Sequence, residues 1–368
     1  MEQLIVDSVE VIGVYVHIPF CKSRCKYCDF FSTTQLERRE DYVQALLQEI
    51  DERVPSTDIA TIYFGGGTPS LLETEQIERL LKALLNKTTT QPTEITLEAN
   101  PGDLTFEKLQ ALRQIGINRL SIGIQSFDDN NLQRIGRRHN AEQARQAVRD
   151  AQAAGFENIS IDLIYALPGE TLTTWQRDID EALQLNVQHI SCYCLSYESG
   201  TPLTKMLNSG QVKQIDEETE NTMFDELCNQ LKANGFEHYE VSNFALPGKR
   251  ARHNSSYWNN TPYIGLGAGA HSYDGQKRRW NIADLTAYVR RMLSHSKYWE
   301  EETLTDEQKS IEHIMLGLRT KDGIALTDEL RPKAQQLIEQ GLLLDKNGQL
   351  IATQSGLHIL NRIIEQLI

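Results

Sequence analysis

Alternating strand-like and helix-like segments constrain the fold of this chain more than any other feature of its sequence. Short runs rich in β-branched and aromatic residues recur at 13–17, 59–64, 94–98, 119–123, 159–165, 189–195 and 238–242. Stretches with helical spacing of apolar residues lie between them, at 42–53, 75–85, 106–115, 141–154, 172–185 and 217–234. Such alternation is typical of parallel sheets built by right-handed crossovers. It predicts an α/β fold, an incomplete barrel of the (βα)6 type or a strongly curved open sheet.

The polar and glycine-rich motifs of the chain fall where these predicted strands end. They comprise residues 65–68, residues 98–101, Gln125 and Asp162. In barrels and open parallel sheets, binding groups lie at the C-terminal ends of the strands. We therefore expect these motifs to share one site.

The character of the sequence changes after residue 245. A stretch rich in glycine, asparagine and aromatic residues runs to residue 274. From residue 305 the pattern is helix, turn and helix, then a strand pair around 345–348 and a last helix, which resembles a winged-helix module. We predict a partial barrel (1–245), a connecting segment (246–300) and a C-terminal winged-helix-like α+β module (301–368). The many acidic residues of this module favour a packing or docking role over DNA binding.

Composition excludes several classes of protein. The chain has 51 acidic and 37 basic residues, a formal net charge of -14, which argues against a general nucleic-acid binder. No run of about 18 apolar residues predicts a membrane span, and the acidic start at 1–8 does not resemble a secretory signal. Six cysteines in 368 residues are too few for a disulfide scaffold and indicate a reducing, cytoplasmic setting. Three of them, Cys192, Cys194 and Cys228, are predicted core residues.

The other three cysteines form the strongest chemical signal. Cys21, Cys25 and Cys28 follow directly after the first predicted strand. Closely spaced thiolates are the usual ligands of iron–sulfur clusters, and three of them leave one iron of a four-iron cluster open. A structural zinc site normally needs a fourth protein ligand, and none is near in sequence. Buried loop cysteines are the remaining alternative, but loops are rarely buried.

A glycine turn ends the second predicted strand, in the sequence Phe64-Gly-Gly-Gly-Thr-Pro69. Glycine lets a ligand approach the backbone, and free amides there can hold a carboxylate or amino group. Alone, such a stretch is more often a simple turn. One strand–helix unit after the cysteine loop, it indicates a second part of the same site.

Together these motifs resemble the radical S-adenosylmethionine superfamily, in which C-x3-C-x2-C is followed by a glycine turn. A narrower match is to the coproporphyrinogen dehydrogenase-like group. It rests on YxHxPFC at 15–21, GGGTP at 65–69, SIGIQSF at 121–127, GR at 136–137, IDLIYxLPG at 161–169 and SNFA at 242–245. The resemblance covers nearly the whole chain.

Two positions in this chain distinguish between two branches of that group. In the dehydrogenase branch, HemN, a fourth cysteine lies two residues after the third, whereas this chain has Phe30. The heme chaperone branch, HemW, has phenylalanine there and an H-N-x-x-Y-W motif, which residues 253–258 match. Both features favour the HemW branch. Glu170 stands where glutamine is often found, and we attach no functional doubt to it.

The resemblance also implies which residues hold S-adenosylmethionine. Tyr15 would lie beside the cluster, Gly66, Gly67 and Thr68 would meet the methionine amino group, and Glu98, Gln125, Arg137 and Asp162 would line the cofactor. Singly, Glu98 can be a solvated strand end, Arg137 a helix-surface charge and Asp162 a cap. Their occurrence at successive strand ends favours a shared site.

For heme, the resemblance implies His253 as the leading ligand, with Asn254, Tyr257 and Trp258 beside it and His271 as the rival. Imidazole is a common axial ligand of heme iron, and aromatic side chains pack on porphyrin faces. The alternative is a structural histidine in an aromatic-rich loop. Basic residues that flank the two histidines would pair with propionates unless they are merely solvated; they are Lys249, Arg250, Arg252, Lys277, Arg278 and Arg279.

The function implied by the resemblance is that of a heme chaperone with a [4Fe-4S] cluster and S-adenosylmethionine, and with no catalytic residue assigned. It would transfer heme to acceptor hemoproteins, respiratory-chain proteins being one class, without coproporphyrinogen dehydrogenase activity. The alternatives are a radical oxidoreductase acting on a porphyrinogen and an iron–sulfur electron carrier. A homodimer and transient contact with membrane proteins are left open, and no nucleic acid is expected.

The cysteine assignment gives a first prediction. Reconstituted protein should hold one four-iron cluster, and Cys21→Ala, Cys25→Ala or Cys28→Ala should each abolish it, because each thiolate would bind a different iron. Iron and acid-labile sulfide analysis measures the content. Cys192→Ala is the control and should keep its cluster; full content in all three motif variants would contradict the assignment.

Overall fold

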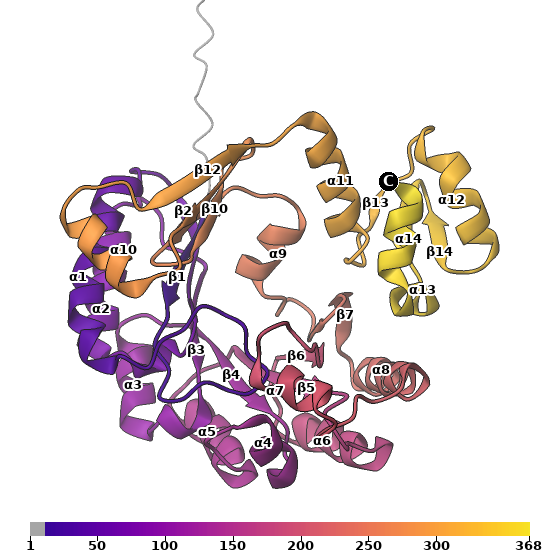
Figure 1. Cartoon of the computed structure of the whole chain (residues 1–368), viewed down its shortest axis with the longest axis horizontal. Helices are drawn as coiled ribbons and strands as arrows, with labels where there is room; N and C mark the ends of the chain where they lie inside the picture. Colours follow the sequence, from indigo (N-terminus) through magenta and orange to yellow (C-terminus); the bar gives the residue numbers. More distant parts are fainter. Residues whose placement is uncertain (1–11) are drawn as a thin grey trace, which may run out of the picture.

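A single curved sheet forms the body of the protein. The computed structural model describes residues 12–368, so the N-terminal segment, where no secretory signal was predicted, lies outside the described residues. The strand order is β12-β11-β10-β9-β1-β2-β3-β4-β5-β6-β8-β7. The parallel centre consists of β1 (Ile12–Ile18), β2 (Ile59–Gly66), β3 (Glu94–Ala99), β4 (Arg119–Gln125), β5 (Ile159–Tyr165) and β6 (His189–Cys194). The predicted α/β partial barrel is confirmed (Figure 1).

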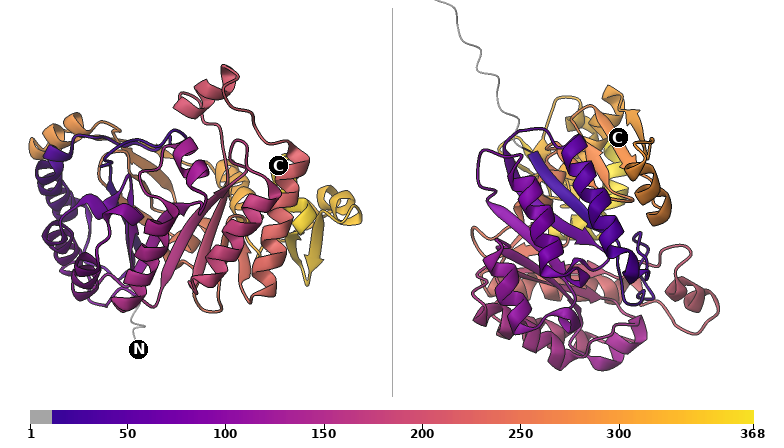
Figure 2. Two further views of the ribbon diagram at one scale, coloured as in Figure 1. Left: turned by 90° about the horizontal axis from the view of Figure 1, so that it is seen from below. Right: turned by 90° about the vertical axis from the view of Figure 1, so that its left-hand side faces the viewer.

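Helices cover the outer face of this sheet (Figures 1 and 2). The crossovers run through α1 (Arg39–Arg53), α2 (Thr74–Leu85), α3 (Phe106–Gln114), α5 (Ala141–Ala153), α6 (Leu172–Gln184) and α8 (Glu217–Ala233). Side-chain caps start several of them; Asn140, for example, accepts from Gln143 N at the start of α5. The sequence did not predict α4 (Asp129–Ile135) or α7 (Pro202–Asn208), because such short helices show little periodicity. Three single turns of 3-10 helix complete the connections, at Leu36–Arg38, Pro69–Leu71 and Pro101–Asp103.

The two faces of the sheet differ in chemistry. On β1, Val14 and Val16 are fully buried in the outer apolar core, and the alternating Tyr15 faces the inside of the curve. Inward positions on other strands hold buried polar groups such as Arg119 and His189. Buried polar groups are normally hydrogen-bonded. The polar groups of this inner face therefore need hydrogen-bond partners from the protein or from a ligand rather than from bulk water.

Residues 237–303 add strands on both sides of the parallel centre. The strand predicted at 238–242 is confirmed as β7 (Glu237–Glu240), which ends two residues early at a turn. The next strand, β8 (Asn243–Ala245), was not predicted and pairs antiparallel with β7. On the other side β9 (Tyr263–Leu266) pairs parallel with β1. The outer strands β10 (His271–Tyr273), β11 (Lys277–Asn281) and β12 (Trp299–Thr303) continue antiparallel, and α10 (Leu285–Leu293) packs on α1.

A short helix, α9 (Arg252–Trp258), lies inside the curve of the sheet (Figure 1). Its first two amides, Arg252 N and His253 N, donate to the Glu94 carboxylate at 2.8 and 3.0 Å. The His253 side chain is fully buried, shares a hydrogen bond of 2.8 Å with Thr61 Oγ1, and stacks on Tyr63. The H-N-x-x-Y-W segment therefore fills the polar interior of the partial barrel.

The C-terminal residues form a small module with its own apolar core. It consists of α11 (Asp306–Gly317), β13 (Ile324–Ala325), α12 (Leu330–Glu339), β14 (Leu343–Lys346), β15 (Gln349–Ala352), α13 (Gln354–His358) and α14 (Leu360–Leu367). This order, with a three-stranded sheet β13-β15-β14, agrees with the predicted winged-helix-like module. Among residues 12–368, no helix has the length and apolarity that crossing a membrane would require.

Glu49 on α1 connects α1 to the added strands. Its carboxylate is fully buried and accepts hydrogen bonds from Arg53 Nη1 (2.6 Å), Gly267 N (2.7 Å), Asn281 Nδ2 (2.8 Å) and Tyr288 Oη (2.5 Å). The bond to Gly267 lies in the glycine loop between β9 and β10. One carboxylate of α1 thus hydrogen-bonds to the glycine loop, β11 and α10, and so connects all three to the helical layer outside the sheet.

Removal of this carboxylate gives the second prediction. Glu49→Ala should lower the free energy of unfolding by about 3–5 kcal/mol, because it leaves several buried donors and a guanidinium without their acceptor. Urea unfolding followed by circular dichroism measures the change. Glu52→Ala, one turn along α1 and paired only with surface groups, should change stability by less than about 1 kcal/mol; equal effects would refute the role of Glu49.

Candidate functional site

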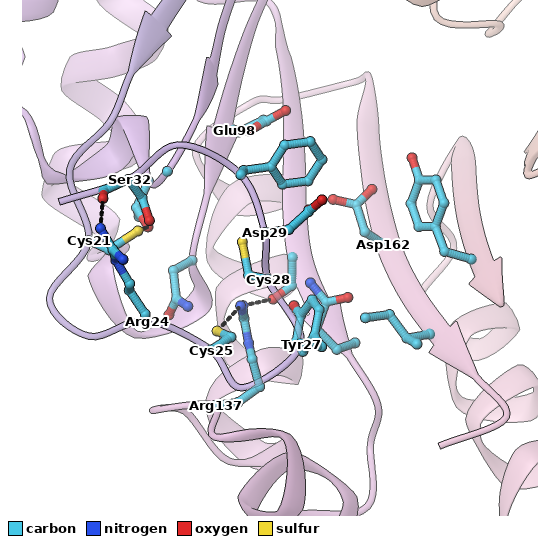
Figure 3. A pocket seen from close by; sticks show the side chains of 18 of the residues that line it. Cys21, Arg24, Cys25, Tyr27, Cys28, Asp29, Ser32, Glu98, Arg137 and Asp162 are labelled. Atoms are coloured by element: carbon cyan, nitrogen blue, oxygen red, sulfur yellow. Dashed lines mark hydrogen bonds between the residues drawn. The ribbon is translucent and has the colours of Figure 1, made fainter. Parts of the chain in front are cut away.

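The cysteine loop leaves β1 and is closed at its base by backbone hydrogen bonds. Thr33 N donates to Pro19 O (2.7 Å) and Cys21 N donates to Thr33 O (2.9 Å). Farther along, Lys26 N donates to Ile135 O (3.0 Å) at the end of α4. Because the loop is held on two sides, its cysteines are presented to the mouth of the barrel (Figure 3).

A cavity of about 480 Å³ lies between this loop and the strand ends. Its wall contains three cysteines and most of the residues expected to bind the cofactor: Cys21, Cys25, Cys28, Gly66, Gly67, Thr68, Glu98, Gln125, Arg137 and Asp162. Tyr15 is the exception. Its ring lies behind the wall, where a Cβ on Gly65 would approach it to 2.9 Å.

The chemistry of the cysteines fits a cluster better than a single ion. All three thiols are free and half-buried, and burial raises the pKa of Cys28 to about 11, so a metal must displace its proton. Over residues 12–368, no three metal-binding side chains converge on one point. The ligands of a four-iron cluster bond separate irons, so they need not converge on one point as the ligands of a zinc ion do. Arg137 Nη1 lies 3.4 Å from Cys25 Sγ, where its charge would stabilise a thiolate.

The glycine turn is required by packing as well as by any ligand. Gly66 has a φ of +115°, and a Cβ there would lie 2.6 Å from the His17 ring. A Cβ on Gly67 would lie 2.8 Å from the backbone of Pro19, within the base of the cysteine loop. A bulky substitution such as Gly66→Val would therefore disturb the loop itself. Side chains in the cavity wall are better probes of ligand binding.

Two half-buried carboxyl groups face the cysteines across the cavity (Figure 3). Glu98 accepts from Tyr63 Oη (2.8 Å) and Gly66 N (3.0 Å), yet desolvation raises its pKa to about 7. Desolvation also raises the pKa of Asp162, which accepts from Ser121 Oγ at 3.1 Å. A cationic ligand would favour the ionised form of both groups, so the pair suits a ligand with positive charge.

Backbone strain marks one further residue of the wall. Gln125 ends β4 with a φ of +74°, a left-handed conformation that is rare for residues other than glycine. Such strain clusters at functional sites, where the surrounding structure maintains it. Gln125 thus lines the cavity in a strained conformation, and its contact with the cofactor stays a prediction.

Sequence reasoning missed several residues of the wall. Tyr193 and Ser121 are inward positions of β6 and β4, which strand alternation alone can reveal. Cys194 was predicted to lie in the core but is half-buried and lines the cavity, whereas Cys192 and Cys228 are buried. Phe30 was noted only as a missing cysteine, and its side chain is 70% exposed at the cavity edge.

The heme candidates lie apart from this cavity and differ in accessibility. His253 has both ring nitrogens in hydrogen-bonding contacts, Nδ1 with Thr61 Oγ1 and Nε2 with Tyr257 Oη, each at 2.8 Å. Tyr257, Asn254 and Trp258 are half-buried on the same helix. His271 on β10 is exposed and stacks on Trp280, with ring centroids 6.2 Å apart.

The flanking basic residues are mostly paired. Arg250 binds Glu237, Lys277 binds Glu301 and Arg278 binds Glu312. Arg279 stacks over Trp299 on the outer face, and Lys249 donates to Glu157 O. Of these, Arg278 lines a second, smaller cavity near α9.

Comparison with known proteins places the fold and site in a class. Residues 15–182 match the family model of the Radical SAM superfamily. Coproporphyrinogen III oxidase (HemN) from Escherichia coli, a radical SAM enzyme, is similar in structure, with a TM-score of 0.83, 23% sequence identity, and coverage of 97% of this chain and 90% of that one. At this identity the likeness concerns the fold alone. The three-cysteine loop on this partial barrel defines a radical SAM protein.

Curated relatives match almost the whole chain and carry the name heme chaperone HemW. The protein from Lactococcus lactis is 36% identical over 97% of both chains. The Bacillus subtilis protein is 35% identical over 94% of this chain and 96% of its own, and the Escherichia coli protein is 32% identical over 96% and 97%. The chain belongs to the HemW heme chaperone family, which confirms the resemblance based on Phe30 and residues 253–258.

The raised pKa of Glu98 gives the third prediction. Folding moves this pKa from about 4.5 to about 7, so between these values the folded protein holds a proton that the unfolded chain has released. Through this group the free energy of unfolding therefore falls as pH rises from about 5 to about 7. The difference between wild type and Glu98→Gln should change by about 2 kcal/mol over that interval.

Urea unfolding at a series of pH values measures this difference. Exposed Glu157 is a suitable control, and Glu157→Gln should follow the wild type at each pH. A constant difference between wild type and Glu98→Gln from pH 5 to pH 8 would show that Glu98 titrates normally.

Proposed function

We propose that the protein binds heme and passes it to acceptor hemoproteins, and that it carries a [4Fe-4S] cluster and S-adenosylmethionine. The observation that carries this proposal is the match over 97% of both chains to a protein named heme chaperone HemW. Phe30 adds support, because the dehydrogenase branch would have a fourth cysteine at that position.

In this proposal the cluster binds Cys21, Cys25 and Cys28. Once bound, it would supply an open iron position for the amino and carboxylate groups of S-adenosylmethionine. The chain's own residues then bind and orient the cofactor: backbone groups of residues 66–68 meet its methionine end, and wall residues surround the remainder. The wall residues are Glu98, Gln125, Arg137 and Asp162, and Tyr15 lies behind the wall, beside the cluster.

The size of the cavity supports a heme site elsewhere. About 480 Å³ lies near the lower end of the range for a single drug-sized ligand, and it has to receive both a cluster and S-adenosylmethionine. A macrocycle would have to bind outside it. Of the two candidate ligands, the contacts of His253 argue for a structural role, because ligation would break a buried hydrogen bond, whereas His271 is exposed.

The partners and the division of the chain are part of the same proposal. Residues 1–245 would hold the cluster and cofactor, 246–300 would carry the heme residues and 301–368 would dock. The acceptor would be a hemoprotein, with respiratory-chain proteins the first class to test. A homodimer would be compatible with this arrangement.

The fourth prediction separates the chaperone from a radical oxidoreductase. Cluster-loaded protein should take up about one heme per chain, followed by the Soret band. With coproporphyrinogen, S-adenosylmethionine and a reductant under anaerobic conditions, it should form no protoporphyrinogen, because Phe30 replaces the fourth cysteine. Sustained product formation would favour the oxidoreductase, and failure to bind heme would refute the chaperone.

Binding of S-adenosylmethionine can be tested in the same preparation. Isothermal titration of cluster-loaded protein should show saturable binding, and Asp162→Asn should weaken it about tenfold, the cost of one charge-assisted hydrogen bond. Asp150→Asn, on the outer helix α5, is the matched control. Absence of binding to the wild type would favour the simple electron carrier.

A further inference from the structure

The inner surface of β9, β10 and β11 carries aromatic and basic side chains that the cysteine cavity does not use. Tyr263 pairs with Gly13 of β1, two residues before Tyr15, and Tyr273 pairs with Tyr263. Paired residues share a face, so these tyrosines lie on the inner side of the sheet. The register sets Arg278 beside Tyr273 and Trp280 beside His271. We call this set the inner aromatic face: Tyr257, Tyr263, His271, Tyr273, Arg278 and Trp280.

A second cavity, of about 230 Å³, opens on this face between the strands and α11. Tyr257 and Tyr263 meet edge to face in its wall, with ring centroids 4.7 Å apart. The Arg278 guanidinium lies over the Tyr273 ring at 5.4 Å, and Leu316 of α11 lines the opposite side. The cavity is smaller than a site for a whole drug-sized molecule, so it suits one edge of a larger, flat ligand.

Arg278 offers this cavity a positioned donor. Its Nε and Nη2 atoms donate to the two oxygens of Glu312 at 3.1 and 2.8 Å, which fixes the plane of the guanidinium. Within residues 12–368 no hydrogen bond uses the third nitrogen, Nη1. A carboxylate on a bound ligand can accept from it without displacing Glu312.

His271 is placed to act on the same ligand. It lies opposite Trp280 and is the diagonal neighbour of Arg278, a separation of about 7–8 Å between such positions in an antiparallel pair. The His271 side chain is exposed, so a ligand on this face can reach its imidazole. The Trp280 ring lies beside the imidazole, with the two ring centroids 6.2 Å apart and the planes 25° from parallel.

We propose that heme binds on the inner aromatic face. His271 binds the iron, the aromatic rings pack against the macrocycle, and Arg278 Nη1 donates to a propionate. The inference rests on the proposed function and adds the site and its chemistry: a flat macrocycle with a carboxylate edge and a metal open to imidazole. In this proposal α9 supports the heme site. Its Tyr257 forms part of the wall of the second cavity, and buried His253 positions Tyr257 through a hydrogen bond to its hydroxyl.

The test compares three probes: heme, heme dimethyl ester and metal-free protoporphyrin. Arg278→Gln should weaken heme binding about tenfold or more, the effect of losing one charge-assisted hydrogen bond, and leave binding of the diester unchanged. His271→Ala should shift the Soret band and weaken heme, but leave metal-free protoporphyrin unchanged. Each comparison is between the affinities of two ligands for the same variant. A general loss of stability would lower both affinities and would leave their ratio unchanged.

Matched controls exist on the same strand and helix. Lys277→Gln removes the neighbouring positive charge on the opposite face and should behave as wild type. Glu312→Gln removes the negative charge that pairs with Arg278 while keeping the guanidinium, and should retain or tighten heme binding. A loss equal to that of Arg278→Gln would make the role of Arg278 structural and overturn the proposal. If wild type binds heme and neither variant changes it, this site is refuted alone; if wild type binds no heme, the chaperone function is refuted with it.

Discussion

The structure depends on a polar inner face that has to find hydrogen-bond partners away from water. A curved sheet of parallel strands packs its outer face against helices, but its inner face here bears Arg119, Asp162 and His189 rather than a second apolar layer. Glu94 and Thr61 are satisfied by α9, which enters from a segment far along the chain. The barrel is thus open at the cysteine end, where a ligand can replace water, and filled at the other.

The same inner face connects the cysteine cavity to the H-N-x-x-Y-W segment, although the two lie at different places in the barrel. Tyr15, Tyr63 and His253 pack against one another as a cluster of three rings, with centroids 6.0, 5.1 and 6.4 Å apart. From this cluster Tyr63 Oη donates to Glu98, which also accepts from Gly66 N in the cavity wall. His253 Nε2 shares a hydrogen bond with Tyr257 Oη on the other side. The cofactor cavity and the inner aromatic face therefore share a rigid aromatic partition.

Much of the fold and of the cofactor site could be predicted from the sequence. The strands were visible because apolar runs at regular spacing report burial directly, and the cysteines because thiol spacing reports a shared ligand. The strand predicted at 238–242 ends at residue 240, and β8 was not predicted, because the turn at 241–242 lacks glycine and proline. Cys194 and Tyr193 were missed because membership of the wall depends on the curvature of the sheet rather than on local pattern.

By itself, the sequence determined the α/β class, the cysteine site and the family, since each of these depends on short-range spacing or on motifs matched in order. Only the tertiary structure shows that the two histidines differ in burial and in hydrogen-bond partners. His253 and His271 lie in equally suggestive segments, yet one is enclosed between Thr61 and Tyr257 and the other is exposed beside Trp280. The physical reason is that burial and hydrogen-bond partners are set by strand pairings between distant segments, such as β1 with β9, which no local pattern encodes.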